Sequence, residues 1–150
     1  MRTLFSPAQV DEIKQRLQRL HPGSPRQWGS MNPAQALAHC TLGIATVTGE
    51  LRPPRLLIGR ILGPLVKSVA FRDHEPMRRN VATAQCLIVT DERDFDTERD
   101  RLCAAIDRMA AAGPGACTTH PHIFFGPLTP DEWGILTYKH LDHHLRQFGV

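Results

Sequence analysis

Three histidines in the last part of the chain lie at spacings that suit metal binding. His140 and His144 are four residues apart, and on an α-helix this spacing places both imidazoles on one face, about 40° apart around the axis. His143 lies one turn from His140 in the other direction, so the spacing alone permits a second pairing. Two imidazoles from one helical turn can bind a single ion, as they do in the His-x-x-x-His motif.

The charged neighbours of His143 favour the pairing of His140 with His144. His143 borders Lys139 and Asp142, whose charged side chains prefer water, whereas His144 lies nearer to the apolar side of the predicted helix. We therefore expect His140 and His144 to point inward and His143 to be solvated.

Because two imidazoles make a weak site, a third ligand should come from another helix, and His39 is the best candidate. Three histidines leave coordination positions open for water or substrate, which is typical of catalytic rather than structural metal sites. Neutral imidazole binds several divalent transition metals, of which we expect zinc or nickel. The alternative is that these histidines are ordinary core or surface residues, because His-x-x-x-His also occurs in helices by chance.

Other motifs that carry chemistry are weaker or missing. Leu141 stands where the His-Glu-x-x-His motif of metalloproteases has its glutamate, and no Glu-x-x-His pair indicates a di-iron bundle. The four cysteines form no Cys-x-x-Cys pair, and Cys40 beside His39 is expected to be a buried core thiol. Residues 1–9 lack the apolar stretch of a signal peptide, so we expect a cytoplasmic protein with reduced thiols.

Four amphipathic helices are predicted to position the histidines. Apolar residues at three- and four-residue spacing, with cap and proline signals, predict helices over residues 7–20, 33–49, 91–112 and 130–147. The last begins at a capping box of Thr129 and Glu132. Residues 71–89 are predicted to form a long crossover, with a possible strand-like run at 86–89. The sequence therefore predicts an all-α four-helix bundle that forms a single domain over residues 1–150.

A further amphipathic segment lies between the second predicted helix and the crossover. Residues 56–69 carry apolar side chains at helical spacing, interrupted by Gly63-Pro64 and by two basic residues, so they form no transmembrane span. A basic amphipathic stretch can lie on a membrane surface, but packing on the bundle or on a subunit partner is the favoured interpretation. The net charge of +3 is weak and dispersed, which argues against a nucleic-acid partner.

Three stretches of the chain resemble a known superfamily. Residues 120–134, 140–147 and 31–40 are similar to the DinB-like superfamily, and more narrowly to a branch of it whose function is unknown. They cover less than half of the chain, but the loop, the helix cap, the His-x-x-His-His run and the upstream histidine occur in the expected order. The resemblance implies a bundle with one crossover and a metal held at one end by three ligands: His39, His140 and His144.

Characterised relatives in that superfamily include mycothiol- and bacillithiol-dependent S-transferases and a maleylpyruvate isomerase. In those enzymes the metal is thought to activate a thiol cofactor, and the relatives tend to form homodimers. The resemblance therefore implies a homodimeric, metal-dependent enzyme that acts on a small molecule, with a low-molecular-weight thiol as a candidate cofactor.

The expected reaction is S-transfer to an electrophilic small molecule, or hydrolysis. The alternative is a non-catalytic helical module, also dimeric, that binds a metal or a small ligand. No catalytic residue is assigned. Gln147, Trp133 and His122 are candidates for the pocket or for the shell behind the metal ligands, although Trp133 and His122 can equally be core and loop residues.

Overall fold

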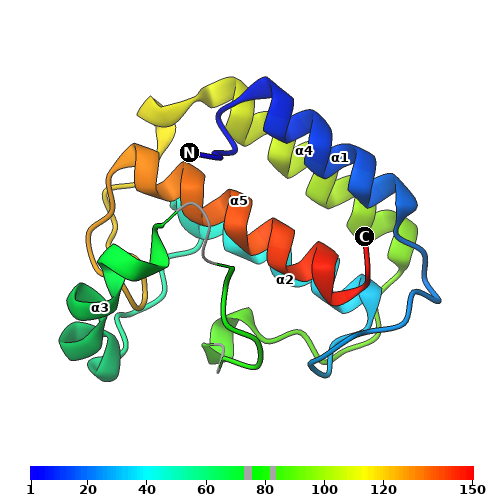
Figure 1. Ribbon diagram of the computed structural model, residues 1–150, viewed down its shortest axis with the longest axis horizontal. Helices are drawn as coiled ribbons and strands as arrows, with labels where there is room; N and C mark the ends of the chain where they lie inside the picture. Colours follow the sequence, from blue (N-terminus) through cyan, green and yellow to red (C-terminus); the bar gives the residue numbers. More distant parts are fainter. Residues whose placement is uncertain (73–75, 82–83) are drawn as a thin grey trace.

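The computed structural model describes residues 1–72, 76–81 and 84–150. Within these residues it is all-helical and contains no strand, as the sequence predicts. Four helices form a bundle: α1 (Pro7–Arg19), α2 (Pro33–Thr48), α4 (Phe95–Ala112) and α5 (Pro130–Gln147). Helices α1 and α2 each pack against both α4 and α5 (Figure 1). Apolar side chains from all four helices meet in one core, which includes Ile13, Ile44, Ile106 and Leu141.

Helices α2 and α5, which carry the histidines, both begin with a capping box followed by proline. The Asn32 side chain accepts a hydrogen bond from the backbone N–H of Gln35, and the Gln35 side chain accepts one from Asn32. Thr129 and Glu132 make the same reciprocal pair at α5, as predicted. These bonds satisfy backbone donors that have no partner within the helix, so each helix starts at a defined residue.

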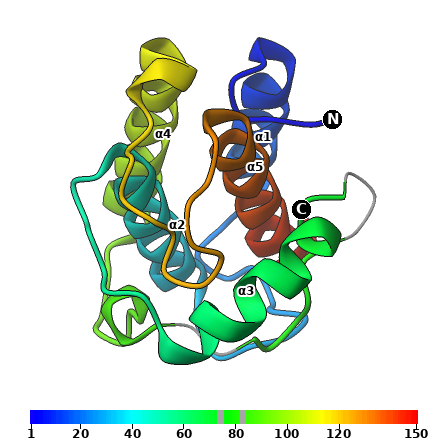
Figure 2. The same ribbon diagram turned by 90° about the vertical axis from the view of Figure 1, so that its left-hand side faces the viewer.

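A long connection joins α2 to α4, as predicted, and it contains α3 (Leu57–Ala70) and the short 3-10 helix η1 (Gln85–Leu87). The expected strand-like run at 86–89 is wrong: η1 occupies its first part, and no neighbouring strand is present among the described residues to pair with it. Figure 2 shows α3 outside the bundle, at one end.

The expected interruption of α3 at Gly63-Pro64 is also wrong, because the helix continues through Pro64. Proline removes one backbone hydrogen bond, but the turns on either side of it are held by the loop that precedes α5. The backbone N–H of Leu56 bonds to the carbonyl of Ile123, and Lys67 bonds to the carbonyl of Pro127. These anchors keep the two halves of α3 in line.

Candidate metal centre

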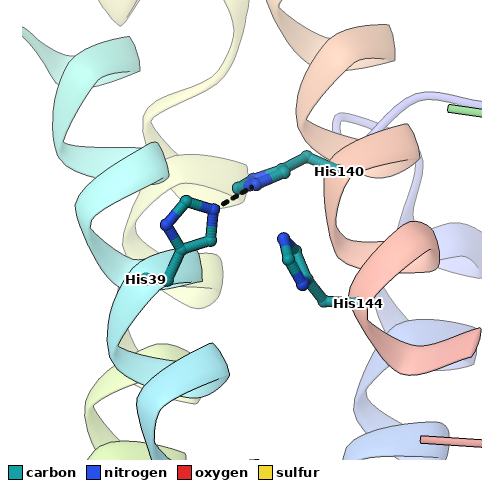
Figure 3. A group of neighbouring side chains, drawn as sticks. All are labelled: His39, His140 and His144. Atoms are coloured by element: carbon teal, nitrogen blue, oxygen red, sulfur yellow. Dashed lines mark hydrogen bonds between the residues drawn. The ribbon is translucent and has the colours of Figure 1, made fainter. Parts of the chain in front are cut away.

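The bundle brings His39, His140 and His144 together, although His39 is a hundred residues away in sequence. Figure 3 shows His39 on α2 facing the two histidines of α5 across the gap between the helices. Each pair of rings has its centroids 4.8 Å apart, and one nitrogen from each ring lies within 4.8 Å of the others. Tetrahedral zinc with bonds of about 2.0–2.1 Å needs donor atoms roughly 3.3 Å apart. Small ring rotations reach that spacing, so the three histidines could hold a metal ion.

Gly43 lets α2 approach α5 closely at this level. A Cβ atom on Gly43 would lie 3.0 Å from both Nδ1 and Cε1 of His140. Gly43 is one turn after His39 on the same face of α2, so the absent side chain leaves room for the imidazole from the opposite helix. A glycine within a helical pattern is the sequence signal that could have indicated this contact.

The backbone carbonyl of Leu87 fixes the ring of His39. His39 Nδ1 lies 2.7 Å from this oxygen. A carbonyl only accepts hydrogen bonds, so Nδ1 carries the proton and, in the neutral ring, Nε2 is left with a free lone pair. His39 Nε2 points at His140 Nε2, 2.9 Å away. Leu87 is in η1, so the crossover reaches back to orient a residue of the bundle.

Gln147 fixes the ring of His144 in the same way. His144 Nδ1 lies 2.8 Å from the Gln147 side-chain oxygen, and the Gln147 amide nitrogen donates to the carbonyl of Trp28 at 2.8 Å. Because the Trp28 carbonyl can only accept, the end of the Gln147 amide that faces it must be the NH2 group. The amide oxygen therefore faces His144 and accepts a hydrogen bond, which places the proton on His144 Nδ1. The Nε2 lone pair of His144 is again left for the centre. Such outer partners are a regular feature of histidines that bind metals.

All three imidazoles are held in the neutral form. Burial lowers the pKa of His39, and it lowers the pKa of His144 to about 3. The pKa of His140 is also lowered well below its ordinary value, first by burial and then by the neighbouring histidines His144 and His39. Neutral rings are the form that binds metal ions, so protons do not compete with a cation here at neutral pH.

His143 is not fully solvated, which corrects the sequence expectation. Its ring is partly buried, with its centroid 5.4 Å from that of Trp28, and burial lowers its pKa. It also lies beside His144, with ring centroids 5.1 Å apart. The loop that carries Trp28 covers this side of α5, and the helical pattern alone could not reveal it.

Lys139 and Asp142 are buried, so the expectation that both side chains lie in water is wrong. Lys139 donates to the carbonyl oxygens of Ala70 and Arg72, at the end of α3. Asp142 forms an ion pair with Arg16 of α1 at 2.8 Å and another with Arg146. Partners from distant parts of the chain replace the lost water, which makes the burial of both charges tolerable.

His122 and Trp133 contact each other beside the trio rather than joining it. Their ring centroids are 5.5 Å apart, and Trp133 is part of the core. His122 Nδ1 accepts hydrogen bonds from the backbone N–H groups of Phe124 and Phe125, and burial lowers its pKa to about 4. His122 thus stabilises the turn of the loop that contains it. It also lies close enough to His140 to influence the pKa of His140.

In the described part of the chain, neither a thiol nor a carboxylate joins the three imidazoles. Among the described residues, His39, His140 and His144 form the only group of three or more potential ligands. Cys40 is buried in the core, as predicted, and burial raises its pKa, so it stays protonated. The centre is therefore a neutral three-nitrogen donor set, which suits a borderline divalent transition metal.

Comparison with known proteins identifies a family and no characterised relative. The family model described as "Protein of unknown function (DUF1569)" matches residues 4–149. No curated protein and no solved structure gives a significant match.

Proposed function

The chain belongs to the DUF1569 family, and we propose that it binds one divalent transition metal ion through His39, His140 and His144. The observation that carries the proposal is the direction of the lone pairs. Hydrogen bonds to Leu87 and Gln147 hold the Nδ1 protons of His39 and His144, so their Nε2 atoms face the centre unprotonated. We also propose that the chain is a member of the DinB-like superfamily. The helical bundle and its histidine trio support this proposal.

We propose zinc or nickel as the ion, because neutral imidazole suits both. Three protein ligands leave at least one coordination position open for water or a small molecule. When bound, such an ion supplies Lewis acidity and lowers the pKa of a water or thiol ligand, which produces a nucleophile at neutral pH. The proposed activity is S-transfer from a low-molecular-weight thiol to an electrophilic small molecule, or hydrolysis.

The chain's own part in this chemistry is to bind and orient. His39, His140 and His144 supply the donors, and Leu87 and Gln147 prevent two of the rings from turning away. His39 is buried, and His140 and His144 are partly buried, which strengthens electrostatic interactions at the centre. His143 and His122 are further titratable groups near the trio, and His122, with a pKa of about 4, remains neutral at pH 7.

One observation favours a second candidate, a metal-binding module without turnover. Asp142 lies two residues from both His140 and His144 in sequence, but its carboxylate is held by Arg16 and Arg146. The described carboxylates therefore do not join the trio, and a general base is not evident. A binding module needs no such base.

Elemental analysis of the purified protein tests metal binding. We expect near-stoichiometric metal in the wild type and in the control His143→Ala, and its loss in His39→Ala and His144→Ala. Equal metal content in all four proteins would refute the ligand assignment. Turnover of an electrophile with a panel of thiols then separates the two candidates: activity that disappears with His144→Ala supports the enzyme, and inactivity of the metal-loaded wild type supports the module.

A further inference from the structure

Helix α3 exposes a continuous apolar surface, which we call the α3 face. Its side chains are between 39% and 77% exposed, and they are Leu56, Leu57, Ile58, Ile61, Leu62, Leu65, Val66 and Val69. At 100° per residue, those within the helix cover about half of its circumference. Together the eight residues expose on the order of 800 Å², which exceeds the largest apolar patch of a typical monomer and is similar to one chain's share of a standard interface.

The opposite side of α3 is already occupied by the protein itself. Gly59 and Gly63 lie directly against the backbone of Phe124, so closely that a Cβ atom on Gly59 would be 2.7 Å from the Phe124 carbonyl oxygen. Lys67 forms an ion pair with Glu132 of α5 at 2.8 Å. The helix is thus attached through its glycines and its lysine. Of the two expected partners for its apolar side, the bundle and a second subunit, the bundle does not cover it. The α3 face is left for a partner.

The apolar pattern of α3 suits a second copy of the same helix. Ile58, Leu62, Leu65 and Val69 follow one another at intervals of four, three and four residues, which is the spacing of a coiled-coil seam. In an antiparallel pair related by a twofold axis, Leu62 meets Leu65 of the partner subunit, and Ile58 meets Val69 of the partner subunit. Every apolar position of the seam then has an apolar counterpart, as an isologous interface requires.

The distribution of charge favours a second copy over a membrane surface. Arg60 and Lys67, the basic residues of α3, lie on the side opposite the centre of the α3 face, and Lys67 is engaged by Glu132. Two copies can therefore pair without bringing like charges together. A helix that lies on anionic lipid uses the basic residues of its polar face to attract the headgroups, whereas the ammonium of Lys67 is already paired with Glu132. No helix in the described part of the chain is long and apolar enough to cross a bilayer.

We propose that the protein is a homodimer in which the α3 faces of two chains pack against each other as antiparallel helices. The proposal stands apart from metal binding, because the α3 face contains none of the three histidines. It predicts that His144→Ala, which should lose the metal, remains dimeric.

Light scattering coupled to size-exclusion chromatography tests the interface. We expect the wild type to show twice the chain mass of 16.8 kDa, and Ile58→Glu/Leu65→Glu to show a twofold lower mass. The matched control is Ala111→Glu, an exposed position on α4, which should remain dimeric. A monomeric wild type, or a dimeric double variant, would overturn the proposal. Circular dichroism and metal content confirm that each variant is folded.

Cysteine cross-linking tests the pairing without disrupting the interface. In a Cys86→Ser background, which removes the exposed native thiol, a mixture of Leu62→Cys and Leu65→Cys chains should form disulfide dimers faster than either variant alone. Faster cross-linking within each variant would contradict the antiparallel pairing. Binding to vesicles of anionic phospholipid distinguishes a dimer interface from a membrane-binding surface. A wild type that is monomeric in solution and binds the vesicles through α3 would assign the α3 face to a membrane and reject the dimer.

Discussion

At the scale of single residues, the state of the site depends on two hydrogen bonds from imidazole Nδ1 atoms. The carbonyl of Leu87 and the side chain of Gln147 select the tautomers of His39 and His144. Burial keeps both rings neutral. Without these partners the rings could present an N–H to the centre instead of a lone pair, and a cation would then bind poorly.

Gln147→Leu should weaken metal binding while leaving all three histidines in place. Leucine has a similar volume but cannot accept the proton of His144, so the ring loses its fixed orientation. We expect the affinity to fall by about 10- to 100-fold, the usual cost of losing an outer partner. Competition with a chromophoric chelator measures it, with Gln18→Leu on the exposed side of α1 as control. An unchanged affinity would show that Gln147 has no part in ligand orientation.

His122 should make the metal-free protein less stable in mild acid. Its pKa is about 4 in the folded protein, against an ordinary value of 6.5. Between these values the unfolded chain holds a proton that the folded chain does not, so the free energy of unfolding falls as the pH falls from about 6.5 toward 4. One such group contributes a slope of up to about 1.4 kcal/mol per pH unit.

His122→Asn isolates this contribution, because the asparagine oxygen can accept the same backbone N–H groups without titrating. Urea denaturation of chelator-treated protein at several pH values gives the free energies of unfolding. We expect a shallower dependence on pH for His122→Asn than for the wild type. Parallel curves would mean that His122 titrates equally in the folded and unfolded chain.

At the scale of helices and loops, the sequence predicts the helices that have a regular periodicity. It does not predict the contacts that irregular segments make with those helices. The four-residue spacing of His140 and His144 and the capping box of α5 correctly predicted a helix that presents both rings on one face. Leu87 was not predictable, because its role depends on where a crossover without a repeating pattern folds back. Lys139 was misplaced for the same reason: its partners are carbonyls at the end of α3.

Gly59→Ala should loosen α3, although alanine is the better helix former by about 1 kcal/mol. The new Cβ atom would lie 2.8 Å from Cα of Phe124, a backbone atom that cannot move as a side-chain tip can. Steric conflict should therefore outweigh propensity. Hydrogen exchange should show faster exchange of the α3 amides than in the wild type. Ser68→Ala, at an exposed α3 position, is the control, and slower exchange in Gly59→Ala would contradict the close packing.

At the scale of the whole molecule, the amphipathic pattern predicted the bundle, because each of its four helices buries one apolar stripe in a shared core. The same rule was misleading for α3, whose apolar stripe faces outward while its glycines face the protein. A pattern shows that an apolar surface must be covered, but it does not show by what. The meeting of His39 with α5 is likewise a property of the assembled bundle, since α2 and α5 must be neighbours for it to occur.

The most direct test of the metal centre is X-ray absorption spectroscopy of the protein loaded with one equivalent of zinc. We expect three imidazole nitrogens at about 2.0–2.1 Å with oxygen completing the shell, and two imidazoles in His39→Ala. Sulfur at about 2.3 Å, or the same imidazole count in the wild type and His39→Ala, would contradict the proposed centre.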